Sequence, residues 1–226
     1  MLQPRLFLFV LALFMLTNSI TKAQTIVDYY HLLADYDDDI KIHPIKKVDH
    51  KWQVQSTTTK EATVFVDTEN NFLEIKDKAE GDIFTLQVSL LQKKNGEILV
   101  AIAKNHMDIF FHGEIHILNY RNGRWNDISE QVLPNLTYQD FVEQSVGLAA
   151  MAYNPQLNHH LEFGYQLPRI GSTASAQMQT QVLKDKCALN DVSVREYCAS
   201  LHEITYSSIE LNWQPEEGIF KIGAKR

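Results

Sequence analysis

The feature that most constrains this chain is a recurring pair of alternating apolar segments joined by a turn sequence. In TLQVSLLQKKNGEILVAIA, the apolar residues Leu86, Val88 and Leu90 alternate with polar ones, and Asn95-Gly96 leads into a second apolar segment. Alternation with a period of two is typical of a β-strand, and Asn-Gly between two such segments favours a tight hairpin. The sequence therefore predicts a β-hairpin here.

The same design occurs three more times along the chain. IHILNYRNGRWNDI turns at Asn122, SIELNWQPEEGIFKIG turns before Gly218, and ATVFVDTENNFLEIKD is a looser case. In the second of these segments Ile209, Leu211 and Trp213 fall on one face of the predicted strand. Because an isolated hairpin is marginally stable, we expect each one to bury a face against the others.

Helix signals are fewer than strand signals. The pattern of residues 25–36 predicts a short N-terminal helix. Thr137 and Asp140 form a capping-box pattern before a segment with helical spacing of its apolar residues, 141–152. We expect an α+β fold, mainly antiparallel β-sheet built from successive hairpins with a few helices, in one domain over 24–226. An all-β sandwich or barrel with peripheral helices is the alternative.

The first residues, MLQPRLFLFVLALFMLTNSITKAQ, have the layout of a secretory signal peptide. Arg5 precedes the apolar run Leu6–Leu16, and a polar stretch with small residues ends at Ala23. A transmembrane helix needs about 20 apolar residues, so we expect no membrane span in the mature protein. Residues 1–23 are predicted to be removed, which makes the mature protein an exported one, periplasmic or extracellular.

The charge of the chain argues against nucleic acid as a partner. The formal net charge is −7, and removing residues 1–23 deletes Arg5 and Lys22 but no acidic residue, which takes it to −9. An acidic surface repels phosphate backbones, and the sequence contains no compensating basic stripe.

The two cysteines, Cys187 and Cys198, are predicted to form a disulfide. In an exported protein a nearby pair most simply bonds to itself. The alternative is a catalytic or metal-bound thiolate, but the spacing matches neither the short zinc motifs nor a redox C-x-x-C motif.

FHGEIH is the segment that most resembles a metal site. His112, Glu114 and His116 alternate with the apolar residues Ile115 and Ile117, so a strand would place all three polar side chains on one face. A solvent-exposed strand face is the simpler interpretation.

A zinc site at these residues would require the strand to bend at Gly113, because the outer pair is too far apart in a regular strand. His106 and Asp108 could add ligands only if the fold brought them close. We therefore expect no metal, no other cofactor, and no stoichiometric zinc.

The acidic run Asp35–Asp39 invites comparison with a calcium-binding EF-hand loop. That loop would require Gly at position 40 and Glu at position 46, where Ile40 and Lys46 stand. We expect a solvated acidic loop instead.

Catalytic motifs are missing from the sequence, and no catalytic residue is predicted. Gly171-Ser172 lacks the rest of a nucleophile elbow, and no phosphate-binding glycine loop occurs. His159 and His160 are adjacent, so at most one could join a site on a strand.

The three tryptophans, Trp52, Trp125 and Trp213, each lie in a predicted hairpin. Exposed aromatic rings on sheets can stack on sugars, but cross-strand packing explains these positions and is the expectation.

YRNGRWNDISEQVLP and GYQLPRIG, with the order of the elements, resemble a loose class of exported bacterial proteins of unassigned function. The resemblance implies a bacterial, extracytoplasmic setting and assigns a role to no residue.

Three functions remain open at this point. The first is a non-enzymatic binding or interaction domain with an unknown protein or glycan partner. The second is an extracytoplasmic hydrolase of glycan or peptide, with or without the assistance of a metal held by His112, Glu114 or His116. The third is a structural, envelope-associated protein.

The secreted protein should begin within a residue or two of Gln24. Intact-mass measurement of secreted material checks this, and a mass that retains Met1 to Ala23 would contradict the signal-peptide assignment.

Overall fold

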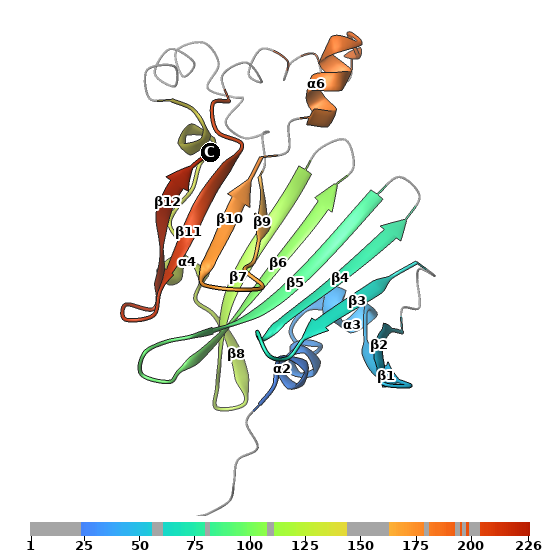
Figure 1. Ribbon diagram of the computed structural model, residues 1–226, viewed down its shortest axis with the longest axis vertical. Helices are drawn as coiled ribbons and strands as arrows, with labels where there is room; N and C mark the ends of the chain where they lie inside the picture. The colour runs from blue at the N-terminus through green and yellow to red at the C-terminus, as the bar shows by residue number, and fades with distance from the viewer. Residues whose placement is uncertain are drawn as a thin grey trace, which may run out of the picture.

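The computed structural model describes residues 24–55, 61–79, 82–107, 111–143, 163–178, 181–192, 195, 198 and 204–226 (Figure 1). Its strands are β1 (Ile45–Val48), β2 (Lys51–Val54), β3 (Thr63–Asp67), β4 (Phe72–Ala79), β5 (Asp82–Gln92), β6 (Ile98–Met107), β7 (Phe111–Arg121), β8 (Arg124–Asp127), β9 (Gly164–Gln166), β10 (Thr173–Gln177), β11 (Ser208–Gln214) and β12 (Ile219–Lys225). Its helices are α2 (Ile26–Leu33), α3 (Asp38–Ile42), α4 (Ser129–Val132), the 3₁₀ helix η1 (Tyr138–Phe141) and α6 (Gln181–Ala188).

The strands form antiparallel sheets of neighbouring hairpins. The largest sheet has six strands in the order β3-β4-β5-β6-β7-β8, and a second has four in the order β12-β11-β10-β9. Strands β1 and β2 form a separate hairpin. The predicted α+β class, mainly antiparallel sheet with a few short helices, is therefore confirmed.

The four predicted hairpins are present as β3–β4, β5–β6, β7–β8 and β11–β12. Of these four, the β7–β8 hairpin has the shortest turn, because Arg121 pairs directly with Arg124 and only two residues lie between them. Those residues, Asn122 and Gly123, have φ values of 53° and 74°, as a type I′ turn requires.

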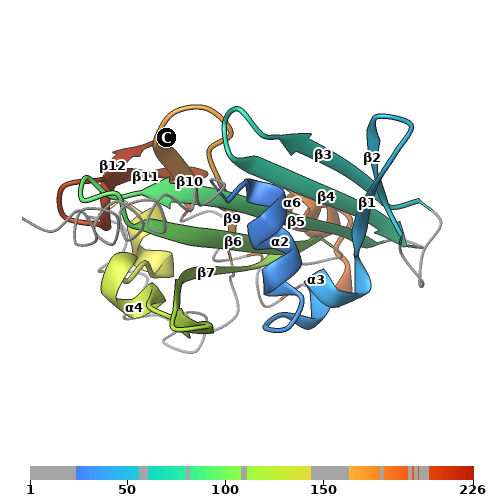
Figure 2. The same ribbon diagram turned by 90° about the horizontal axis from the view of Figure 1, so that it is seen from below.

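The six-stranded sheet is buried on both faces. Helices α2 and α3 lie against one face, and the four-stranded sheet packs on the other (Figure 2). The helix-covered face is formed by Leu73, Ile75, Leu86, Val88, Val100, Ile102 and Leu118, against Ile26, Tyr30, Leu33 and Ile40. The opposite face is formed by Leu99, Ala101, Ala103, Ile115 and Ile117, against Leu167, Ala174, Leu211 and Phe220.

Burial on both faces changes the role of the polar residues in β5. Gln87 and Ser89 alternate with Leu86 and Val88 along the strand, and they are nevertheless only 0% and 4% exposed. The side chain of Gln87 donates to Glu74 (2.8 Å) and accepts from the backbone N–H of Leu167 (2.9 Å). Gln87 is thus a polar link between the two sheets, where it satisfies a buried backbone donor.

Gly113 lets strand β9 pass close to strand β7, and it does not form a bulge. The β6–β7 pairing runs in regular register through this residue, so the strand is not bent there. A Cβ atom at position 113 would overlap the Cα atom of Gly164 in β9 and lie 2.9 Å from the carbonyl oxygen of Phe163. Asn105 fixes the crossing, since its side chain donates to the carbonyl of Tyr165 and accepts from the Tyr165 N–H, both at 2.8 Å.

The helix predictions had mixed outcomes. The N-terminal helix is confirmed as α2, and the capping box between Thr137 and Asp140 is present. The helix predicted to follow is wrong at its start, because η1 ends at Phe141 and Val142 is extended and bridges Ile204. Residues 144–162 lie outside the described part of the chain, as do 1–23.

Cys187 at the end of α6 is bonded to Cys198, with 5.6 Å between the Cα atoms.

The tryptophans occupy packed positions, as predicted. Trp213 is 6% exposed and contacts Phe220, and Trp125 packs against Tyr120. Within the described residues, no helix has the length and hydropathy needed to cross a bilayer.

Replacing Gly113 with Ala should lower the free energy of unfolding by about 3 kcal/mol, since a methyl group would be forced into backbone that cannot move aside. Gln92→Ala, an exposed position in β5, serves as the control and should change stability by under about 0.5 kcal/mol. Urea denaturation measures both variants, and a Gly113→Ala protein as stable as the control would contradict the close packing of β9 on β7.

Candidate functional site

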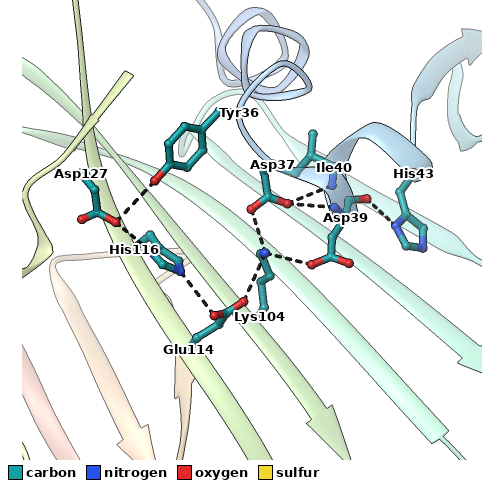
Figure 3. Close-up of polar contacts among 9 residues, drawn as sticks. All are labelled: Tyr36, Asp37, Asp39, Ile40, His43, Lys104, Glu114, His116 and Asp127. Carbon is teal, nitrogen blue, oxygen red and sulfur yellow. Dashed lines mark hydrogen bonds and ion pairs between the residues drawn. The ribbon is translucent and has the colours of Figure 1, made fainter. Parts of the chain in front are cut away.

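Charged side chains gather on the helix-covered face of the large sheet, where α2 leads into α3 (Figure 3). This group, the charged network, consists of six ionisable side chains and a tyrosine hydroxyl that donates to one of them: Asp37, Asp39, Lys104, Glu114, His116, Asp127 and Tyr36. It joins the segment between α2 and α3 to strands β6, β7 and β8. The sequence separates these parts by more than 60 residues.

The acidic run is solvated at Asp35 and Asp38, as the sequence predicted, but not at Asp37. Asp37 is 8% exposed and caps α3, because its Oδ1 accepts from the backbone N–H groups of Asp39 (3.0 Å) and Ile40 (3.2 Å). A carboxylate at a helix N-terminus satisfies backbone donors that the helix leaves unpaired. The other oxygen of Asp37 is 2.8 Å from Lys104, a contact that sequence reasoning missed.

Lys104 is the centre of the charged network. Its Nζ lies 2.8 Å from Asp37, 2.9 Å from Asp39 and 3.2 Å from Glu114, and its side chain is 10% exposed. Burial acts to lower the pKa of Lys104, but hydrogen bonds to Asp37 and Asp39 outweigh it and raise the pKa above its ordinary value. Lys104 therefore stays protonated and cannot serve as a nucleophile or a base.

Glu114 and His116 share one face of β7, as the alternation predicted, and Ile115 and Ile117 point into the core. That face is partly exposed but not free of contacts. His116 Nδ1 is 2.8 Å from Asp127 and its Nε2 is 3.4 Å from Glu114, so both ring nitrogens face carboxylates. The side chain of His112 lies outside the part of the chain that the structure describes.

Two carboxylates of the charged network, those of Glu114 and Asp127, are held ionised. Burial acts to raise the pKa of Glu114, but Lys104 and His116 outweigh it, and the pKa falls below its ordinary value. The pKa of Asp127 is also lowered. Burial acts to raise it, but hydrogen bonds from Ser129 and His116 outweigh that effect. A general acid must instead be protonated near neutral pH, so neither residue has the environment of a hydrolase acid.

The charged network does not have the arrangement of a metal centre. Among the described residues, no group of three or more His, Cys, Asp or Glu side chains could hold a metal ion. The expectation that the protein binds no zinc stays a prediction, because the side chain of His112 is not part of that set.

A second polar contact fastens the end of α3 to the sheet. His43 is 3% exposed, with Nε2 3.0 Å from Asp77 of β4 and Nδ1 2.7 Å from the carbonyl of Asp39. A carbonyl oxygen only accepts, so Nδ1 carries a hydrogen. The ring also stacks on Phe84 with 5.5 Å between centroids, which makes His43 a buried anchor.

A different region, at the β3 edge of the large sheet, contains a hollow of about 530 Å³. This edge hollow is lined by Thr63, Val64, Phe65, Phe72, Glu74, Lys76, Gln166 and Arg169.

Phe65 is 42% exposed, and the guanidinium of Arg169 lies 4.4 Å from the centre of its ring. Asp67 holds Arg169 in place, with Oδ2 2.7 Å from Nε. Hydrogen bonds from Asn70 and Arg169 lower the pKa of Asp67 to about 2.

The sequence contained one signal for the edge hollow, the position of Phe65 in its strand, although only the three tryptophans were considered as exposed aromatic residues. Phe65 stands between Val64 and Val66, which pack on the core, so the alternation places its ring on the opposite face. Arg169 could not have been paired with Phe65 from the sequence, because the two lie more than 100 residues apart.

Comparison with known proteins supplies no function. No protein-family model matches the chain, and no curated protein matches its sequence. A solved structure of a domain of an uncharacterized protein from Porphyromonas gingivalis W83 is similar, with a TM-score of 0.48 and 10% sequence identity. The similarity covers 80% of this chain and 79% of that one. The structural match is thus to an uncharacterised bacterial domain with no named function.

Replacing Lys104 with Met should lower the free energy of unfolding at pH 7 by about 3 kcal/mol, because three carboxylates lose their counter-charge. Contact with Lys104 helps to lower the pKa of Glu114, so this carboxyl contributes stability above its ordinary pKa, and that stability is lost as pH falls through the lowered value. The difference in the free energy of unfolding between Lys104→Met and the unchanged protein should therefore be smaller at about pH 3 than at pH 7.

Urea denaturation at both pH values measures this difference. Lys94→Met is the matched control, because Lys94 pairs with Glu216 at the exposed surface and should contribute at most about 1 kcal/mol. A loss that is the same at both pH values would contradict the ion-pair account.

Proposed function

We propose that this protein is an exported, non-enzymatic binding domain and that its edge hollow binds a glycan. Support for export comes from the signal-peptide layout of residues 1–23 and from the Cys187–Cys198 bond, since disulfides persist in oxidising compartments.

The observation that carries the proposal is the exposed ring of Phe65 beside polar groups in a hollow. Ligand sites combine an apolar or aromatic surface with a few fixed polar groups that orient the ligand. The part of the Phe65 ring that Arg169 does not cover supplies apolar surface for the C–H face of a sugar, and Arg169, Glu74 and Gln166 supply hydrogen-bonding groups for its hydroxyls.

The polar groups of the edge hollow are held in position before any ligand arrives. Glu74 is bound by Gln87 (2.8 Å) and by Lys76 (2.8 Å), and Arg169 by Asp67. Groups that are fixed in advance lose little conformational freedom on binding, which favours affinity.

The hydrolase alternative has weaker support from the charged network. Catalysis by Glu114 or His116 would need a group that can take up or release a proton near neutral pH. Glu114 is ion-paired to Lys104 with a lowered pKa, and both nitrogens of His116 face carboxylates. These contacts suit a structural ion-pair network better than an acid–base pair.

A glycan array tests the proposal. The unchanged protein should bind a subset of immobilised oligosaccharides, and Phe65→Ala should weaken that binding at least about tenfold, which is about 1.4 kcal/mol. Ile222→Ala is the matched control, because Ile222 is 43% exposed on β12 and does not line the edge hollow.

Three outcomes would overturn the glycan proposal: no binding to any glycan, equal binding by Phe65→Ala, or saturable binding to a peptide array that Phe65→Ala abolishes. Release of reducing sugar from a bound oligosaccharide, lost in Glu114→Gln, would move the hydrolase to first place.

A further inference from the structure

The tip of the β7–β8 hairpin carries two arginines directly opposite each other. Arg121 and Arg124 are cross-strand partners that flank the turn at Asn122 and Gly123. Like charges in this position destabilise a sheet. The turn geometry itself requires only the two central residues, so the arginines are not explained by the folding of the hairpin.

The counter-charge near this pair is incomplete. Arg121 is ion-paired with Glu97 at the β5–β6 turn, but Glu97 also binds Lys93 at 2.9 Å. Within the described part of the chain, no carboxylate oxygen lies within 4.0 Å of the guanidinium of Arg124. Arg121 and Lys93 therefore share one carboxylate, and Arg124 has no described counter-ion, in a chain whose formal net charge is −7.

These arginines line a hollow of about 570 Å³ together with three asparagines, Asn119, Asn122 and Asn126. Asn126 Nδ2 donates to Asn119 Oδ1 at 3.1 Å, and Asn119 is 9% exposed. Because Oδ1 of Asn119 accepts this bond, its Nδ2 group remains as a donor that bonds to no described acceptor. The lining is thus rich in donors and carries excess positive charge.

We propose that this hairpin hollow binds an oxyanion, the carboxylate or sulfate group of a polar ligand. Guanidinium groups hold such oxygens in two parallel charge-assisted hydrogen bonds, and amide N–H groups add further donors. The bound anion would also relieve the repulsion between Arg121 and Arg124. This site lies on the β7–β8 edge of the large sheet, whereas the edge hollow lies at β3, so the proposal does not depend on glycan binding.

Amide NMR spectra of the purified protein, recorded during titration with sodium sulfate and with sodium glucuronate at constant ionic strength, test the proposal. Both probes should cause saturable shifts confined to the amides of residues 119–126. Arg124→Gln should weaken the binding of both at least about fivefold, because the unpaired guanidinium is lost. Tighter binding of glucuronate would identify a carboxylate ligand, and tighter binding of sulfate a sulfate ester, and either supports the oxyanion site.

Arg226→Gln is the matched control, since it removes the same charge from an exposed pair with Glu210 and should bind both probes as the unchanged protein does. Arg124→Gln should fold at least as stably as the unchanged protein without anion, because a repulsive pair is removed. Asn126→Asp, which adds a carboxylate to the hollow, gives a second variant that should abolish binding.

Equal shifts with sodium chloride, shifts spread over the whole protein, or unchanged binding by Arg124→Gln and Asn126→Asp would overturn the proposal. Loss of binding by Arg226→Gln to the same extent would also overturn it, since the effect would then follow net charge alone.

Discussion

The ion pairs of Lys104 are the interaction on which the helix-covered side of this protein depends. A protonated amine buried in a β-sheet is costly unless it is paired and hydrogen-bonded. Asp37 and Asp39, from the segment after α2, and Glu114, from β7, supply that pairing. The contacts bring the start of α3 down onto β6 and leave the apolar residues of α2 packed on the sheet. The second buried contact, between His43 and Asp77, fixes the other end of α3.

This arrangement separates the chemistry that stabilises the protein from the surfaces that could recognise a ligand. In the charged network, Lys104 is held protonated and Glu114 and Asp127 are held ionised, which suits structure and not acid–base catalysis. The two hollows differ in kind. The edge hollow offers the ring of Phe65 with fixed polar groups, and the hairpin hollow offers donors around Arg124.

Local patterns predicted the strands well, because alternation and turn residues act over a few neighbours in the sequence. The hairpin at Asn122 and the buried face of Ile209 are examples. What the sequence could not show were pairings between distant segments. The solvated loop expected at Asp37 was wrong, and no sequence pattern indicated that Gln87 is buried, because their partners, Lys104 and Leu167, lie 67 and 80 residues away.

We infer that the charged network fastens the α2–α3 segment to the large sheet. Native-state hydrogen exchange of the Lys104→Met variant tests it most directly, because local opening is resolved amide by amide. The amides of α2 and α3 should lose protection selectively, while those of the four-stranded sheet keep the protection seen in the unchanged protein. Protection that falls equally in both regions, or that does not change in α2 and α3, would show that the charged network does not fasten this segment.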